Sequence, residues 1–127
     1  MARIENFEEL KIWQIARELC RIVKALTLKG PFLKDFKFSS QINSAAGSVM
    51  DNIAEGFERD GNKEFINFLY IAKGSNGEVR SQSYRAIDGN YISAEEQSEV
   101  LILTEKLKFK IQGFISVLKN SSPKGYK

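Results

Sequence analysis

Apolar residues recur at the spacing of an α-helix along most of this chain, and this pattern limits the chain to an all-helical fold. Three glycine-containing turn signals, at residues 29–31, 60–62 and 88–90, divide it into four segments. In the last segment the apolar positions follow at intervals of three or four residues: Val100, Leu103, Leu107, Ile111, Phe114 and Leu118. The spacing predicts helices over about residues 7–28, 40–59, 63–88 and 94–119.

The connections between the four segments are short, and a short connection can join only neighbouring helices of opposite direction. The sequence therefore predicts an all-α fold, an antiparallel up-down-up-down four-helix bundle. With 127 residues, 43% of them hydrophobic, residues 1–127 can form one domain with a sizeable core. Residues 120–127 have no apolar period, and we expect this tail to be disordered.

Residues that favour helix N-termini precede the predicted segments. Ser93 is followed three residues later by Glu96, the pattern of a capping box. Gly74 and Gly77 lie within the third segment, where each costs up to about 1 kcal/mol of helix propensity, so we expect a packing reason or a local bend there. The predicted N-caps are Asn6, Ser39 or Ser40, Asn62 and Ser93.

Composition excludes the commonest enzyme chemistries. The chain has no histidine, and its single cysteine, Cys20, cannot form a disulfide framework. No apolar run reaches the roughly 18 residues that span a membrane, and the acidic N-terminal segment does not resemble a signal peptide. We therefore expect a cytoplasmic protein with no cofactor, no bound metal and no membrane association.

Basic residues form a stripe on the first predicted helix, although the net charge of the whole chain is only +3. Arg17, Arg21 and Lys24 occur at i, i+4 and i+7, in a sector that also holds Leu10 and Trp13. Such a stripe can follow phosphates while Trp13 stacks on an unpaired base. The alternative is that Trp13 packs in the bundle and the cations are only solvated. Further lysines that could contribute are Lys106, Lys108 and Lys110.

A ladder of polar residues follows one flank of the second predicted helix. We expect its side chains to hydrogen-bond across a helix interface, either to another subunit or to polar residues of the third helix, namely Ser75, Asn76, Glu78, Ser81 and Gln82. Glu55 precedes Arg59 by four residues, the favourable order for an ion pair on a helix. No carboxylate pair and no nucleophile with a base is recognisable, which disfavours catalysis. The ladder consists of Gln41, Ser48, Asn52, Glu55 and Arg59.

Some apolar residues lie outside the predicted core stripe of the fourth helix. Ile102 and Phe109 are one heptad apart on the opposite face, and Leu101 and Ile115 flank the stripe. A monomeric bundle would expose them, and stacked apolar residues on a polar face favour a subunit contact. The residues predicted to contact another copy are Leu10, Trp13, Ile102 and Phe109.

Two stretches resemble a known family. The sequences NIAEGFER at residues 52–59 and EFINFLYIAKGS at residues 64–75, followed by Glu78, resemble the four-helix-bundle family named after the 23S rRNA intervening-sequence protein. The start of the chain from Phe7 to Trp13 is also similar, and the resemblance extends over about residues 5–118.

The resemblance implies an antiparallel four-helix bundle that assembles into a cyclic oligomer, with a pentamer as the favoured assembly, in a bacterial cytoplasm. It implies no established enzymatic activity. The family is similar to the accessory protein of diversity-generating retroelements, a basic barrel associated with nucleic acid and a reverse transcriptase. The resemblance also implies structural or interface roles for four motif positions, Gln41, Asn52, Glu55 and Arg59. The family often has basic residues directly before its Ala-Ala pair, whereas this chain has Asn43 and Ser44.

Two functions are compatible with these features. The first is a non-enzymatic, oligomeric helical bundle that binds RNA, DNA or a ribonucleoprotein through its basic helix faces. The alternative is a scaffold that binds a protein partner and has no affinity for nucleic acid.

Overall fold

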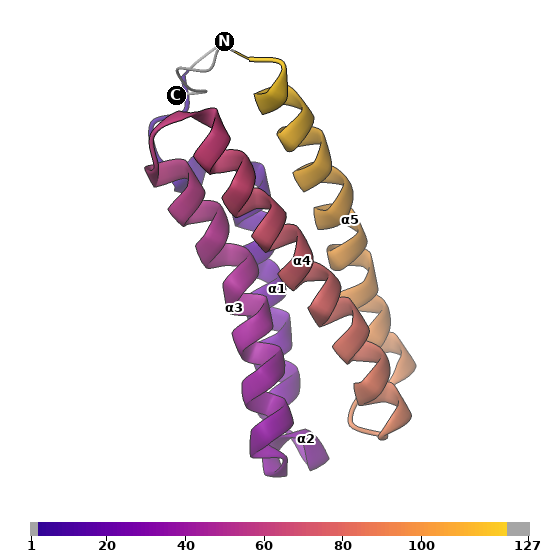
Figure 1. Cartoon of the computed structure of the whole chain (residues 1–127). Helices are drawn as coiled ribbons and strands as arrows, with labels where there is room; N and C mark the ends of the chain where they lie inside the picture. The colour runs from indigo at the N-terminus through magenta and orange to yellow at the C-terminus, as the bar shows by residue number, and fades with distance from the viewer. Residues whose placement is uncertain (1–2, 122–127) are drawn as a thin grey trace.

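Four long helices form the molecule, each running opposite to the long helix before it (Figure 1). The structure is a computed structural model and describes residues 3–121. The predicted all-α bundle is confirmed, and the described residues contain no strand. The six elements are η1 (Phe7–Glu9), a short 3-10 helix, and the α-helices α1 (Lys11–Thr27), α2 (Gly30–Lys34), α3 (Phe36–Glu58), α4 (Gly61–Asp88) and α5 (Ala94–Lys119).

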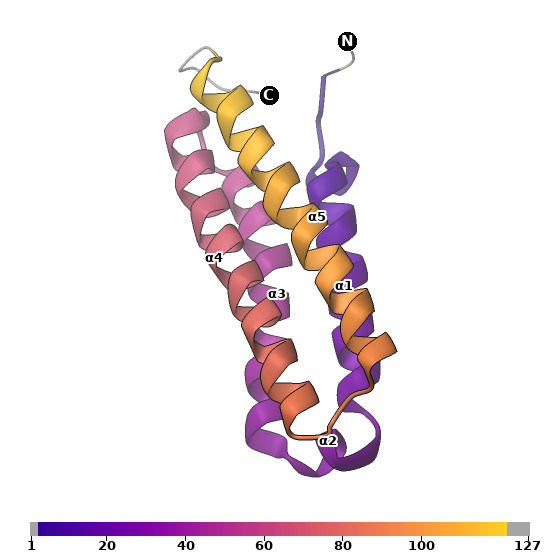
Figure 2. The same ribbon diagram turned by 90° about the vertical axis from the view of Figure 1, so that its right-hand side faces the viewer.

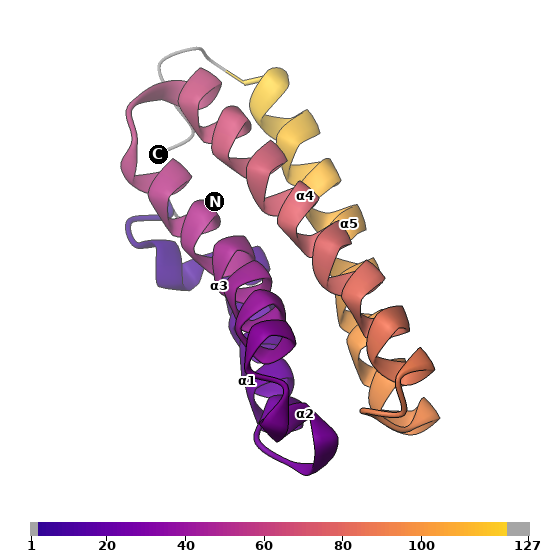
Figure 3. The same ribbon diagram turned by 60° about the horizontal axis from the view of Figure 1, so that its bottom comes forward.

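Each long helix packs against two of the other three. Helix α1 contacts α3 and α5, and α4 contacts the same two helices, so the bundle closes around one core (Figure 2). The short α2 lies at one end, where it leads from α1 into α3 (Figure 3). The largest fully buried side chains include Leu19, Phe32, Ile53, Phe57, Phe65, Leu69, Leu107 and Ile111.

The first predicted helix, over residues 7–28, is two elements rather than one. Asn6 begins η1, and its backbone N–H donates a hydrogen bond to Glu9 Oε2 at 2.9 Å. Leu10 then adopts an extended conformation, with φ −72° and ψ 126°, and separates η1 from α1. This break lets η1 fold against both α1 and α3. The N-terminal segment consequently covers part of the α1 surface.

The connection before α3 contains structure that the sequence did not indicate. Pro31 lies in the first turn of α2, where its missing N–H costs nothing. Asp35 caps α3, because its Oδ1 accepts the Phe38 N–H at 3.0 Å, and its Oδ2 accepts the Tyr91 hydroxyl at 2.6 Å. The Tyr91 bond is the main cause that lowers the pKa of Asp35. Helix α3 thus begins four residues before the predicted position, and the two serines expected as its cap lie inside it.

Hydrogen bonds from buried asparagines fix how α4 lies along α5. Asn62, predicted to be the N-cap of α4, is instead buried in its first turn and donates from Nδ2 to the Leu118 carbonyl at 3.1 Å. Fourteen residues later, Asn76 donates from Nδ2 to the Thr104 carbonyl at 2.7 Å. The acceptors are also fourteen residues apart, so both bonds require the same antiparallel register.

Helix α5 begins as predicted. The Ser93 Oγ accepts the Glu96 N–H at 3.1 Å, and the Ser93 N–H donates to Glu96 Oε1 at 2.8 Å, which completes the capping box. Lys29 Nζ lies 2.6 Å from Glu96 Oε2. This ion pair links the residue before α2 to the start of α5, and it is the main cause that lowers the pKa of Glu96.

Gly56 allows α3 and α4 to approach closely near their connection. A Cβ at this position would lie 2.8 Å from the Phe68 Cβ and 3.0 Å from the Phe65 Cδ1. Away from this end the two helices diverge (Figure 1). By contrast, a Cβ at Gly74 or Gly77 would meet nothing within 4 Å, so packing within the chain does not account for these two glycines.

Replacing Gly56 with alanine should lower the free energy of unfolding by about 1–2 kcal/mol, because the overpacking cost exceeds the gain in helix propensity. Gly47 in α3 is the matched control, since a Cβ there meets nothing within 4 Å. Gly47→Ala should raise stability by up to about 1 kcal/mol. Urea unfolding followed by circular dichroism measures both, and a stabilised Gly56→Ala protein would contradict the close approach.

Candidate functional site

The predicted polar ladder lies along the seam between α3 and α4, where part of it is hydrogen-bonded. Ser48 Oγ lies 2.8 Å from Ser75 Oγ of α4, a residue expected as a partner. Asn52 donates from Nδ2 to the Ser48 carbonyl at 2.8 Å and to the Ser48 Oγ at 2.9 Å. These three side chains form one network and hold the middle of the seam together.

The end of the ladder nearest the α3–α4 connection is an exposed ion pair. Arg59 Nη2 lies 3.0 Å from Glu55 Oε2, and both side chains are about half exposed. The Arg59 guanidinium also lies over the Phe68 ring, 5.1 Å from its centroid. An exposed pair of this kind contributes at most about 1 kcal/mol, so its role is local.

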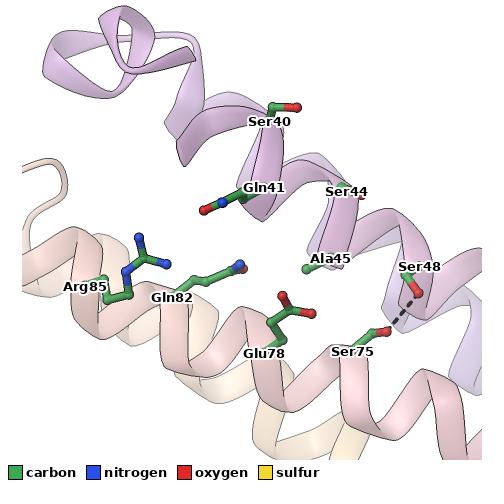
Figure 4. Close-up of a pocket in the computed structure, with 9 residues that line it drawn as sticks. All are labelled: Ser40, Gln41, Ser44, Ala45, Ser48, Ser75, Glu78, Gln82 and Arg85. Carbon is green, nitrogen blue, oxygen red and sulfur yellow. Dashed lines mark hydrogen bonds between the residues drawn. The ribbon is translucent and has the colours of Figure 1, made fainter. Parts of the chain in front are cut away.

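At the other end of the seam, α3 and α4 border a polar pocket of about 550 Å³ (Figure 4). Gln41, the first residue of the ladder, contributes to its α3 wall. The α4 wall carries Glu78, Gln82 and Arg85 at successive turns of the helix. The pocket is lined by Ser40, Gln41, Ser44, Ala45, Ser48, Ser75, Glu78, Gln82 and Arg85.

Several polar side chains of this pocket have no partner within residues 3–121. Gln82 is only 4% exposed, yet its Oε1 accepts no hydrogen bond. Glu78 makes no ion pair and no hydrogen bond there. Arg85 makes no hydrogen bond there either: its guanidinium lies over the Phe38 ring, 4.5 Å from its centroid, and its charge helps to lower the pKa of Asp35. Gln41 likewise has no hydrogen-bond partner there. The pocket therefore offers unused donors and acceptors from both helices.

The basic stripe on α1 is exposed as predicted. Arg17, Arg21 and Lys24 all face solvent. Arg21 Nη1 lies 3.8 Å from Glu18 Oε2, and the Arg17 guanidinium lies over the Trp13 ring, 5.8 Å from its centroid. Neither contact buries the cations, so the stripe is accessible to an anionic partner.

Of the two alternatives for Trp13, the structure shows packing in the bundle rather than a ring free to stack on a base, and the expected contact of Trp13 with another copy is wrong. Trp13 is 9% exposed, and its ring packs edge to face against Phe7 at 5.2 Å between centroids. Leu10, which was expected to be a contact with another copy, is 2% exposed. Both are covered because the chain breaks at Leu10 and η1 folds back against α1 and α3.

The three lysines of α5 do not form one patch with one another. Lys106, Lys108 and Lys110 are all exposed. Lys106 and Lys110 are four residues apart and share a side of the helix, whereas Lys108, two residues from each, lies on another side. Lys108 Nζ lies 5.7 Å from the centroid of the Phe109 ring.

The apolar residues of α5 divide into exposed and buried ones. Ile102 is 63% exposed and Phe109 65% exposed, as predicted for a face opposite the core. Ile115 was also expected to be exposed, but it is fully buried, and Leu101 is half-buried. The core stripe of α5 is thus wider than its sequence pattern indicated, because α1 and α4 both pack against this helix.

Comparison with known proteins places the chain in a family. Residues 8–113 match the family described as the 23S rRNA-intervening sequence protein. The chain belongs to this family. A search of curated proteins gave no significant match.

A solved structure supports the same fold. It is a protein with unknown function from the S23 ribosomal protein family of Bacteroides thetaiotaomicron, and it superposes with a TM-score of 0.74. The two chains are 23% identical, and the match covers 82% of this chain and 97% of the other. At this level of identity the likeness concerns the fold alone.

In this member of the intervening-sequence protein family, the residues that resemble family motifs meet along the α3–α4 seam. Asn52 hydrogen-bonds with Ser48, Ser48 lies against Ser75, and Glu78 faces the pocket. Gln82 was among the partners expected for the ladder, whereas Arg85 was not. Arg85 lies seven residues after Glu78, and this spacing, which places the two residues on one side of a helix, could have identified Arg85 as part of the site.

The described residues show neither a reactive thiol nor a metal site. Within residues 3–121 there is no group of three or more Asp, Glu, Cys or His side chains that could hold a metal ion. No helix in this part of the chain is long and apolar enough to cross a membrane. Burial, with a smaller effect of Asp51, raises the pKa of Cys20 to about 11, and its Sγ donates to the Ala46 carbonyl at 3.2 Å.

Cys20 should therefore react slowly with iodoacetamide, because the thiolate is the nucleophile. At pH 8 the thiolate fraction is about 100-fold below that of a thiol with the reference pKa of 9.0. The alkylation rate of the folded protein should rise with pH up to about 11. Mass spectrometry measures the rate, and the protein unfolded in guanidinium chloride is the control. A rate that levels off near pH 9 in the folded protein would contradict the burial of this thiol.

Proposed function

We propose that this protein is a non-enzymatic, self-associating helical bundle that binds RNA or DNA, alone or in a ribonucleoprotein, through its basic helix faces. The exposed stripe formed by Arg17, Arg21 and Lys24 on α1 carries the proposal. Lys106 and Lys110 on one side of α5, and Lys108 on another, extend it. We place the protein in the cytoplasm, without a cofactor.

Two features support a nucleic-acid partner. Three cations along one side of a straight helix can follow the phosphates of a single strand or of one duplex strand, and neutralising those phosphates releases counterions. The chain also belongs to a family named after an rRNA intervening sequence. Similarity to the accessory protein of diversity-generating retroelements stays a hypothesis.

Reversing the stripe should abolish binding while leaving the fold intact. In the variant Arg17→Glu, Arg21→Glu, Lys24→Glu, we expect loss of at least 100-fold in affinity for a single-stranded RNA, measured by fluorescence anisotropy. For the unmodified protein the logarithm of affinity should fall with the logarithm of salt concentration, with a slope near −2 if three phosphates of a single strand are neutralised.

A control with the same net charge separates a local contact from a general charge effect. Lys34, Lys37 and Lys63 are exposed lysines on other elements, and their reversal to glutamate changes the net charge by the same amount. This control variant should retain more than about a third of the affinity. Equal losses in both triple variants would argue against the α1 stripe.

The second candidate function is a scaffold for another protein, without affinity for nucleic acid. The specific observation in its favour is the exposure of Ile102 and Phe109 on the outer face of α5.

We propose that the same two residues contribute to association between copies of the chain, with a pentamer as the favoured assembly. A heterologous contact that closes on itself gives a ring of this kind.

The variant Ile102→Glu, Phe109→Glu should shift the assembly toward the 14.4 kDa protomer, because two charges would be buried at the contact. Light scattering coupled to gel filtration measures the mass. Leu28→Glu, Leu33→Glu is the matched control, since both leucines are also exposed but lie at the end of the bundle. An unchanged mass in the first variant would reject this placement of the contact.

A further inference from the structure

The pocket between α3 and α4 has no role in the proposed binding by the α1 stripe. It holds about 550 Å³, within the range of pockets that bind small molecules or single nucleobases. Its unusual property is the unpartnered Gln82, whose Oε1 is buried and accepts no hydrogen bond from residues 3–121. An unmet acceptor of this kind destabilises the protein unless a ligand or ordered water supplies the donor.

The polar side chains of the α4 wall follow one another in a definite order. Glu78 offers only acceptors, Gln82 offers one acceptor and a donor amide, and Arg85 offers only donors. In Figure 4 the Glu78 carboxylate and the Arg85 guanidinium are directed toward α3, with the Gln82 side chain between them. Along the wall the chemistry changes from acceptor, through a mixed amide, to donor.

A ligand that fits this wall must present donors to Glu78 and acceptors to Arg85. Guanine has this order around two adjoining edges: the N2 amine and N1–H donate on the Watson–Crick edge, O6 accepts at the corner, and N7 accepts on the Hoogsteen edge. Adenine presents an amine between two ring acceptors, uracil an N–H between two carbonyls, and cytosine a single amine beside acceptors. Cytosine can follow the same order of donors and acceptors, but it has no ring N–H for the buried Gln82 Oε1. Of the four RNA bases only guanine offers an amine to Glu78, a ring N–H to Gln82 Oε1 and acceptors to Arg85.

We propose that the α3–α4 pocket binds a guanine base. Glu78 accepts from the N2 amine, Gln82 accepts from N1–H through Oε1 and donates to O6, and Arg85 donates to O6 and N7. Glu78 and Arg85 lie seven residues apart, about 10 Å along the helix axis. The distance from the N2 amine to N7 of guanine, extended by a hydrogen bond of about 2.9 Å at each end, is of similar length.

The overall charge and the opposite wall agree with this ligand. One carboxylate and one guanidinium leave the pocket without net charge, which suits a neutral base. Gln41 and Ser44 of α3 supply further polar groups, and Ala45 supplies a small apolar surface. The base can belong to a free nucleotide or to an unpaired residue of RNA, and only the second source rests on the proposed function.

The first arm of the test uses free nucleotides. Calorimetry compares guanosine monophosphate with inosine monophosphate, which lacks only the N2 amine. We expect guanosine monophosphate to bind at least tenfold more tightly. In Glu78→Ala this preference should fall to within twofold, while inosine monophosphate binds as before. Glu64→Ala removes an exposed carboxylate from the same helix outside the pocket and should keep the preference.

The second arm uses a ten-residue oligouridine with guanine or inosine at one central position. A preference for guanine in either arm that Glu78→Ala removes supports the proposal, and the responding arm identifies the source. No preference in both arms, or a preference that persists in Glu78→Ala, overturns it. Circular dichroism checks that the variants are folded.

The two proposals fail separately in this experiment. If the oligouridines bind with salt-dependent affinity but without base preference, the guanine pocket is wrong and the function of the α1 stripe stands. If guanosine monophosphate is preferred while no oligonucleotide binds even at low salt, the pocket stands and nucleic-acid binding is wrong.

Discussion

The contact at Gly56 determines how α3 and α4 are arranged and, through them, where the pocket lies. With no side chain at this position, the α3 backbone rests on Phe65 and Phe68 of α4. The helices meet there and diverge toward their other ends. At mid-seam the Ser48 and Ser75 hydroxyls still reach each other, but Gln41 and Arg85 do not, and the pocket begins between them. One close approach thus explains the tight packing of one end and the open polar wall of the other.

Three buried polar residues of α4, Asn62, Asn76 and Ser83, make hydrogen bonds with α5, on the side of α4 away from the pocket. Asn62 and Asn76 donate to backbone carbonyls of α5, and Gln97 of α5 donates to Ser83 at 3.5 Å. The three positions on α4 differ by multiples of seven, the interval at which a helix presents one face to a neighbour. Leucine at positions 62 and 76 would also fill buried space, but without these hydrogen bonds it would permit α5 to slide by a turn. Their hydrogen bonds therefore contribute specificity of register more than stability.

The helical periodicity of the sequence was sufficient to predict the number, order and approximate bounds of the long helices. It also located the Ser93 cap, because that signal is local. It failed at Leu10 and Trp13, since a helical projection assumes one uninterrupted helix and cannot see η1 folding back over α1. The Asp35 cap was missed although its bond to the Phe38 N–H is local, because Ser39 and Ser40 favour helix N-termini by residue type as well. Its bond to Tyr91, 56 residues away, follows from no local pattern.

The candidate site was predictable only in part. The ladder on α3 was recognised from its spacing, and Ser75 was among its expected partners, because faces of single helices follow from sequence. Which ladder residues find partners depends on the local distance between helices, which Gly56 controls. Gln41 is for this reason unpartnered although it belongs to the same flank as Ser48.

The pairing of α4 with α5 also has a consequence for the order of folding. These helices are joined by a short loop, and the contact of Gln97 with Ser83 spans only 14 residues. Contacts between α1 and α5 close nearly the whole chain into one loop, and closing a longer loop costs more conformational entropy. We expect the α3–α4 and α4–α5 hairpins to form early and the α1–α5 contact to form last, since contacts of low sequence separation form fastest. The helix that carries the basic stripe then closes the bundle.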